Sequence, residues 1–268
     1  MTGTYAVIGD PIDHSMSPLI HNAAFKELKM DSSYIAYKIG RDELKDGVES
    51  IKNALLSGFN VTIPHKVEIL KYLDSYDDDC KKVGAANTVS ISDGRLSGYN
   101  TDMEGFLDPL RERNIDIKDM DVLVLGAGGA ARAIVASLAR QRVSSITIAN
   151  RTKSSAKALL ELADVQIESI HDAPRLAKSA SLIVNATSLG LKNEQSIIPA
   201  ESMNADQIIY DLVYRPMKTE LLREATKAGS IIIYGYEMLL GQACRSFKIW
   251  HKIDAPRKVM RRAIVGGF

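Results

Sequence analysis

The 268-residue sequence has few cysteines and no long apolar run. These features argue against a disulfide-stabilised protein and against a membrane-spanning one. Cys80 and Cys244 are too few for a disulfide framework, so we expect a reducing cytoplasm, although two cysteines could pair. No run of about 18 apolar residues is present, which argues against a membrane span. A strand-like run at Tyr5–Gly9 opens the chain without a basic leader, so we predict no signal peptide.

The sequence also lacks an excess of charge of either sign and any low-complexity tract or short repeat. Its formal net charge is +1, so we expect no nucleic-acid partner and no membrane surface as a partner. Hydrophobic residues at 46% and charged residues at 25% are ordinary for a globular protein. A chain of this length can bury the core of one large domain or two moderate ones.

Short β-rich runs alternate with longer amphipathic runs, which predicts an α/β protein built from βαβ units around mainly parallel sheets. In a first block we predict helices at 17–29, 42–56 and 103–113 and strands at 5–8, 34–39, 59–63, 88–91 and 96–99, the last two joined by an Asp-Gly turn. In a second block we predict helices at 130–140, 154–163 and 218–227 and strands at 122–125, 145–149, 181–185, 207–212 and 230–234.

Two final helices, predicted at 236–250 and 256–265, have no strand after them. We therefore expect the tail to fold back on the first block. The predicted organisation is two domains with a cleft between them. Residues 1–101 plus 238–268 form a discontinuous first domain, and residues 102–237 form a continuous second domain.

A strand, a glycine turn and a helix start follow one another in VLVLGAGGAARA, residues 122–133. Gly126, Gly128 and Gly129 stand where a dinucleotide-binding turn needs them, with Ala131 in place of the usual third glycine. Glycine lets the backbone approach a pyrophosphate, and the helix N-terminus supplies unpaired N–H groups. The alternative is a tight turn without a ligand, but the flanking strands favour a Rossmann-type nucleotide site.

The next strand ends in Asn150, Arg151 and Thr152 and lacks the acidic residue that an NAD site normally places there. Arg151, with Lys153 close by, offers a planar donor set for a 2′-phosphate. A solvated basic loop would not explain the missing acid, so we predict NADP. The segments 185–190 and 211–216 also put small polar residues at strand ends, where ligands of such sheets bind, although either one alone fits an ordinary loop.

The segment NVTIPHK, residues 60–66, ends a predicted strand with polar groups that a core strand does not need. Asn60 and Thr62 point to one side at strand period. Desolvation and a helix start would lower the pKa of Lys66, which suits a proton donor, although a surface lysine is the plain alternative. Asp102 is its expected companion, with capping of the following helix as the competing role.

Two serines in the loop after the first strand form a possible anion site. Ser15 and Ser17 lie beside a helix start, where Ser17 fits an N-cap followed by Pro18, and both hydroxyls suit a carboxylate. His14 and His21 have no partner at a ligand spacing, so we predict no metal.

Eight segments in this order resemble the shikimate dehydrogenase family over essentially the whole chain. They are HSMSP at 14–18, NVTIPHK at 60–66, GAANTV at 84–89, GYNTD at 98–102, GAGGA at 126–130, NRT at 150–152, NATS at 185–188 and GYEMLLGQA at 235–243. The resemblance implies a substrate-binding first domain and an NADP-binding second domain. It also implies a small-molecule substrate and the reversible, NADP-dependent reduction of 3-dehydroshikimate to shikimate, in the chorismate route to aromatic amino acids.

The resemblance also implies residue roles. Lys66 and Asp102 would be the acid–base pair, and both would touch the substrate. The other substrate contacts would be Ser15, Ser17, Asn60, Thr62, Asn87, Tyr214 and Gln242. The cofactor contacts would be Gly126, Ala127, Gly128, Gly129, Ala130, Asn150, Arg151, Thr152, Lys153, Thr187, Leu212, Gly235 and Met238.

One departure and three alternatives accompany this resemblance. Many family members carry a further basic residue where this chain has Ser155, and Lys153 and Lys157 are the nearby substitutes. The alternatives are an NAD-using quinate/shikimate dehydrogenase, a redox sensor that binds NADP without turnover, and a folate-pathway dehydrogenase, which would not need the two serines. The family includes monomers and homodimers.

Overall fold

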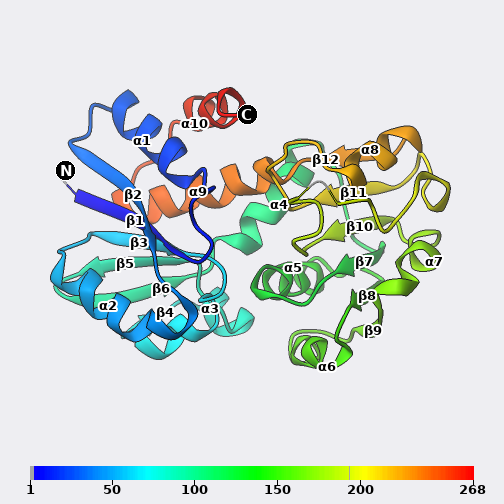
Figure 1. Ribbon diagram of the computed structural model, residues 1–268, viewed down its shortest axis with the longest axis horizontal. Helices are drawn as coiled ribbons and strands as arrows, with labels where there is room; N and C mark the ends of the chain where they lie inside the picture. The colour runs from blue at the N-terminus through cyan, green and yellow to red at the C-terminus, as the bar shows by residue number, and fades with distance from the viewer. Residues whose placement is uncertain (1–2, 193) are drawn as a thin grey trace. The chain divides into compact units, whose positions relative to one another are not determined.

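The computed structural model describes residues 3–192 and 194–268 and divides the chain into two units (Figure 1). Met1–Gly105 and Leu240–Phe268 make up the first unit, and Phe106–Leu239 makes up the second. Both boundaries fall inside helices, α4 (Asp102–Glu112) and α9 (Gly235–His251). The C-terminal helices therefore belong to the same unit as the N-terminal strands.

The first unit contains a six-stranded mixed sheet in the order β2-β1-β3-β5-β6-β4. Strand β1 pairs in parallel with β2 and β3, and β3, β5 and β6 continue in antiparallel fashion. Asp93 and Gly94 both have positive φ, which closes the predicted β5–β6 hairpin. The strands are β1 (Gly3–Gly9), β2 (Ser32–Lys38), β3 (Gly58–Val61), β4 (Ser75–Tyr76), β5 (Thr88–Ser92) and β6 (Arg95–Tyr99).

Helices cover this sheet on both faces. Helix α2 (Leu44–Asn53) packs its buried apolar residues on the face that carries Phe59 and Val61. Aromatic side chains from β1, from α1 (Ser17–Glu27) and from α9 form a second cluster, in which Tyr5 lies 4.8 Å from Trp250 between ring centroids. Helix α10 (Arg257–Gly266) packs beside α1, and α3 (Asp78–Val83) precedes β5 (Figure 1).

The second unit contains six parallel strands in the order β12-β11-β10-β7-β8-β9. Numbered from β7, this order is 6-5-4-1-2-3, which is the doubly wound order of a Rossmann-type domain. The predicted fold of this part is therefore confirmed. The strands are β7 (Asp121–Leu125), β8 (Ser145–Asn150), β9 (Gln166–Ser169), β10 (Leu182–Asn185), β11 (Ile208–Asp211) and β12 (Ile231–Ile233).

Strand β7 shows why a strand of this sheet appears in the sequence as a continuous apolar run. Val122 and Val124 face a core shared with α5 (Gly129–Arg140), whereas Leu123 and Leu125 face a core shared with α7 (Ala173–Ala177) and α8 (Glu220–Lys227). A strand that is covered on both faces needs apolar residues at every position.

Several parts of the second unit differ from the prediction, among them the short helix α7, which was not predicted. The predicted helix 154–163 is only α6 (Lys153–Ala156), followed by a 3₁₀ turn at Lys157–Leu159. Strand β9 was not predicted because it is an edge strand that buries little and shows no apolar alternation. Across the part of the chain that the structure describes, no helix is both long and apolar enough to traverse a bilayer.

Candidate functional site

The first unit brings Lys66 and Asp102 together. Lys66 follows β3, and its Nζ donates to Asp102 Oδ2 over 2.5 Å. The two side chains are 14% and 5% exposed, so the pair is held largely out of water, and Lys66 is the more accessible of the two. Removal from water strengthens the attraction between the two charges, and a fixed partner fixes where the ammonium points.

Asn100, and not Asp102, caps helix α4. The Asn100 Oδ1 accepts from the backbone N–H groups of Asp102 and Met103, at 3.2 and 3.3 Å, while its Nδ2 donates to the carbonyl of Ala85. The competing capping role that the sequence left open for Asp102 is thus performed two residues earlier. The Asp102 carboxylate is left available for Lys66.

Asn87 holds the second oxygen of that carboxylate. Its Nδ2 donates to Asp102 Oδ1 over 2.9 Å, to Thr101 Oγ1 over 2.8 Å and, more weakly, towards Gln242 Oε1 at 3.4 Å. The backbone N–H of Thr101 donates to Asn87 Oδ1, which fixes the orientation of the amide. Asn87 and Gln242 are both predicted substrate ligands, and both lie beside Asp102 or its neighbours.

The side-chain amide of Asn60 is already hydrogen-bonded within the protein. It is 5% exposed, its Oδ1 accepts from the Tyr34 hydroxyl over 2.6 Å, and its Nδ2 lies 3.0 Å from the carbonyl oxygen of Asn87. Two further acceptors, Thr88 Oγ1 and Ser246 Oγ, lie within 3.0 Å of the same nitrogen. Asn60 therefore supports Asn87 directly, and a contact with substrate would require it to give up one of these bonds.

The serine pair lies at the start of α1, but Ser17 is not its N-cap. Ser17 is the first helical residue, Met16 occupies the cap position without a side-chain bond, and Ser15 Oγ accepts from the Ser17 N–H over 3.3 Å. The Ser17 side chain is instead buried and hydrogen-bonds with the Tyr34 phenol, whose pKa burial raises well above its usual value. Ser15 and Thr62 are half-buried.

In the second unit, the glycine turn has the geometry that a pyrophosphate site requires. Gly126 has a φ of +98°, and a Cβ on it would lie 2.8 Å from Thr187 Cγ2. Gly128 is exposed, and a Cβ on it would meet nothing within 4 Å. Helix α5 begins at Gly129 without a side-chain cap, so its first N–H groups remain open to an anion. These residues fit a dinucleotide.

Asn185 and Asp211 hold Thr187 beside that turn. Asn185 Oδ1 accepts from both the N–H and the hydroxyl of Thr187, and its Nδ2 donates to Asp211 Oδ1 over 2.8 Å. Asp211 also accepts from the N–H of Val213 and from the hydroxyl of Thr219. Burial raises the pKa of Asp211 to about 6, against the lowering effect of these bonds. The strand-end segments had pointed to this region, but not to Asp211 as its anchor.

At the end of β8, Arg151 is exposed and forms no ion pair within residues 3–192 and 194–268, so its guanidinium suits an incoming phosphate. Asn150 Nδ2 donates to Thr152 O and to Ser155 Oγ, both at 2.8 Å. Ser155, the departure from the family pattern, therefore braces this loop. Lys153 Nζ lies 3.4 Å from Glu168 Oε2, and this ion pair partly neutralises the positive charge of Lys153.

The remaining predicted cofactor and substrate residues of the second unit differ in exposure. Tyr214 and Leu212 are half-buried after β11, and a Cβ on Gly235 would lie 2.5 Å from Leu212 O. Met238 is 7% exposed and belongs to the core that includes α5, so little of it is available to a ligand.

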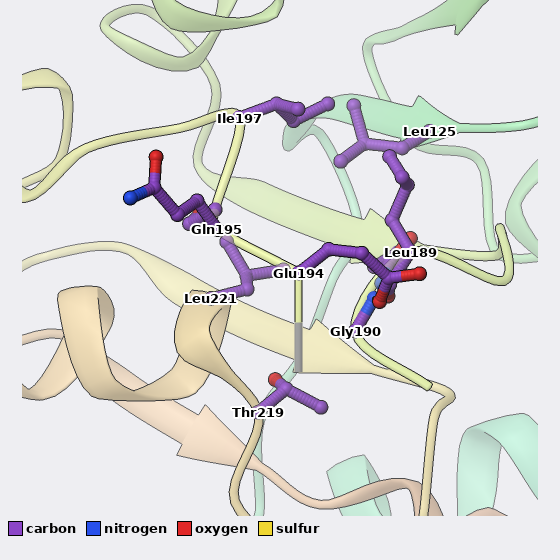
Figure 2. Close-up of a pocket in the computed structure, with 10 residues that line it drawn as sticks. Leu125, Leu189, Gly190, Glu194, Gln195, Ile197, Thr219 and Leu221 are labelled. Atoms are coloured by element: carbon purple, nitrogen blue, oxygen red, sulfur yellow. The ribbon is translucent and has the colours of Figure 1, made fainter. Parts of the chain in front are cut away.

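A separate pocket is lined in part by the loop that follows β10 (Figure 2). Figure 2 shows Glu194 beside Gly190, with Thr219 below and Ile197 above. The Glu194 carboxylate accepts from the N–H groups of Gly190 and Lys192, so it serves the loop itself. Over the described ranges no group of three His, Cys, Asp or Glu side chains is arranged to hold a metal ion.

Comparisons with known proteins agree along the chain. Family models match for the shikimate dehydrogenase substrate binding domain at residues 7–89, shikimate / quinate 5-dehydrogenase at 110–210, and the shikimate 5'-dehydrogenase C-terminal domain at 235–265. The shikimate dehydrogenase (NADP(+)) of Nitrosopumilus maritimus (strain SCM1) is 55% identical over 273 residues, covering 100% of both chains.

Two solved structures show the same similarity. A shikimate dehydrogenase in complex with NADP+ matches with a TM-score of 0.92 and 39% identity, over 99% of this chain and 96% of that one. The shikimate 5-dehydrogenase of Thermus thermophilus, in complex with NADP(H) and shikimate, matches with a TM-score of 0.90 and 35% identity, over 100% of each chain.

Proposed function

Because the chain belongs to the shikimate dehydrogenase family, we propose that it catalyses the reversible, NADP-dependent interconversion of 3-dehydroshikimate and shikimate. The observation that carries this proposal is the largely buried Lys66–Asp102 pair, because a binding protein without turnover has no need of an ammonium held at 2.5 Å from a carboxylate. The pair also argues against a redox sensor.

Lys66 is the proton donor in the direction of ketone reduction. The bound nicotinamide supplies the hydride. As hydride reaches the carbonyl carbon, negative charge develops on the oxygen, and the Lys66 ammonium transfers a proton to it. Asp102 holds Nζ in place through this transfer, and Asn87 holds Asp102. In the direction of alcohol oxidation the neutral Lys66 amine accepts the hydroxyl proton.

The serine pair supports the choice of a substrate that carries a carboxylate. Ser15 offers its hydroxyl at the N-terminus of an eleven-residue helix, where an anion is favoured, and Ser17 would join it by releasing the Tyr34 phenol. Thr62, Asn87 and Gln242 then serve the ring hydroxyls, with Asn60 behind Asn87. The folate-pathway alternative has no use for the serine pair.

The cofactor assignment rests on the glycine turn and on Arg151. The open N–H groups of α5 receive the pyrophosphate, Asn150, Arg151 and Thr152 receive the adenosine 2′-phosphate end, and Thr187 lies against Gly126. We keep cytoplasm as the predicted location, which fits the lack of a disulfide at Cys80 and Cys244 in the described part of the chain, and a monomer or homodimer as the predicted assembly.

The direct test is the absorbance of reduced nicotinamide with shikimate and NADP, beside parallel reactions with NAD and with quinate. We expect turnover with shikimate and NADP. One of the matching family models also covers quinate dehydrogenases, so preferential turnover of quinate with NAD would replace the proposed substrate and cofactor. NADP binding without any turnover would favour the sensor.

Replacing Arg151 with alanine tests the cofactor assignment separately. We expect the KM for NADP to rise by a factor on the order of 10 to 10², because a charge-assisted bidentate contact is lost, while the KM for NAD changes little. Lys178→Ala is the matched control, since it removes another exposed positive charge of the second unit that has no predicted role in cofactor binding. Equal effects of Arg151→Ala on NADP and NAD would remove Arg151 from the 2′-phosphate site.

A further inference from the structure

A set of buried polar side chains in the first unit links Ser17 to Asp102. Tyr34, Asn60, Asn87, Thr88, Thr101 and Ser246, here called the buried polar network, are each between 0% and 5% exposed. Polar groups in an interior cost free energy unless they are hydrogen-bonded. The members of this network supply one another's partners, so the removal of one leaves another unsatisfied.

Tyr34 sets the direction of the bonds at Asn60. The Asn87 carbonyl oxygen can only accept, so Asn60 must turn Nδ2 towards it and Oδ1 towards Tyr34, 2.6 Å away. The Tyr34 hydroxyl must therefore donate to Asn60. Without that hydroxyl, the buried Asn60 oxygen loses the donor that orients it, and the amide that supports Asn87 is held at its nitrogen end alone.

Ser246 joins the network from the C-terminal helix α9. Its Oγ lies 3.0 Å from Asn60 Nδ2, 2.7 Å from Thr88 Oγ1 and 3.3 Å from Thr101 Oγ1. The Ser246 hydroxyl therefore contacts residues of β3, of β5 and of the segment before α4. It also bonds the carbonyl of Gln242 in its own helix over 3.0 Å.

Asn87 carries the network to the candidate acid–base pair. Thr88 and Thr101 contact its Oδ1, and its Nδ2 donates to Asp102 Oδ1. Asp102 Oδ2 then accepts a hydrogen bond from Lys66 Nζ. The carboxylate is thus held at both oxygens, by the network at one and by the lysine at the other.

We propose that Tyr34 and Ser246 are positioning residues, which orient Asp102 towards Lys66 through Asn60, Thr101 and Asn87. The inference deepens the proposed function and rests on it. Both residues act through others, so their loss should slow the chemical step and leave the binding of ligands nearly intact. A misplacement of about 1 Å at a reacting group can cost on the order of 10² in rate.

The test measures kcat and ligand affinity for Tyr34→Phe and Ser246→Ala in the full chain. We expect kcat to fall by about 5- to 30-fold for each, and the Kd values for NADP and shikimate to change by less than about 3-fold. An unchanged kcat, or a loss of shikimate affinity with kcat preserved, would overturn the proposal. An inactive wild-type protein would instead defeat the proposed function.

Two control variants match the loss of a buried hydroxyl. Tyr5→Phe removes a phenol from the aromatic cluster that also contains Trp250, and Ser137→Ala removes a fully buried serine that bonds the carbonyl four residues earlier, as Ser246 does. We expect kcat of both controls to stay within about 2-fold of wild type, because the Tyr5 hydroxyl hydrogen-bonds with Ser57 and Ser137 belongs to the second unit. Equal losses in the controls would mean that any buried hydroxyl matters.

The Lys66→Ala background separates positioning from a general structural role. Once the lysine is gone, the orientation of Asp102 towards it no longer affects the rate, so Tyr34→Phe should lower the residual kcat by less than about 2-fold. A merely structural defect would lower the residual rate by the same factor as it lowers that of the wild type. That result would overturn the proposal even if the single variant behaves as expected.

Discussion

Lys66→Ala is expected to lower kcat by a factor on the order of 10² or more, with the Kd values for shikimate and NADP largely unchanged. The substitution removes the group that exchanges a proton with the substrate oxygen, and leaves Asn87, Thr62 and the serine pair in place. Steady-state kinetics combined with direct ligand titration check this result.

Lys71→Ala is the matched control for this substitution. Lys71 lies five residues later and pairs with Glu68 on the surface, with 68% of its side chain exposed. We expect its removal to leave kcat unchanged. A large rise in KM with kcat preserved in Lys66→Ala would contradict the assignment and make Lys66 a binding residue.

Acidification from pH 7 to pH 5 is expected to destabilise the first unit through two buried histidines. His21 and His251 are 0% and 1% exposed, and none of their ring nitrogens has a hydrogen-bond partner in the described part of the chain. Burial lowers the pKa of His21 to about 3 and that of His251 to about 4, so both must stay neutral in the folded protein.

The sign follows from proton binding. Below pH 6.5 the two histidines of the unfolded chain bind protons, whereas those of the folded protein stay neutral. The free energy of unfolding is therefore unaffected by them above pH 6.5 and falls as the pH drops towards 4 and 3. At pH 5 the loss is about 2 kcal/mol for each histidine, from about 1.4 kcal/mol per pH unit. Asp211 in the second unit acts in the opposite direction, because its pKa is raised to about 6.

Trp250 makes this prediction measurable for one unit alone. It is the single tryptophan, and its ring centroid lies 5.4 Å from that of His21. Urea titrations followed by tryptophan fluorescence should give a lower free energy of unfolding at pH 5 than at pH 7. The double variant His21→Leu and His251→Leu should lose most of this dependence, because leucine does not titrate. An equal pH dependence in wild type and variant would show that other groups cause it.

The sequence was sufficient where local chemistry decides the structure. The turn at Gly126 and Gly128 and the Asp93–Gly94 hairpin require backbone conformations or approaches that glycine allows, so they could be predicted from adjacent residues. The long apolar strand β7 and its helix α5 followed from their own periodicity. The expected partnership of Lys66 with Asp102 rested on two strand and hairpin ends, and the structure brings them into contact.

Other features could not be predicted because they depend on contacts between distant segments. Ser246 lies 186 positions from Asn60 in the sequence, and only the packing of α9 on the first sheet brings them together. Asn100 displaced Asp102 as the helix cap because Ala85 O holds its amide in place, which no nearby residue indicates. Asp211 and Thr219 meet for a similar reason, across the loop after β11.

The discontinuity of the first unit has a consequence for how the protein is made. A ribosome delivers Met1–Gly105 first, then all of Phe106–Leu239, and only then the segment that carries Ser246 and Trp250. The Rossmann-type unit is contiguous and can fold during synthesis, whereas the first unit must keep Tyr5, Tyr34 and their aromatic neighbours uncovered until Trp250 of α9 emerges. The newborn chain thus completes its dinucleotide-binding unit before the segment that carries Ser246 and Trp250 can complete the acid–base unit.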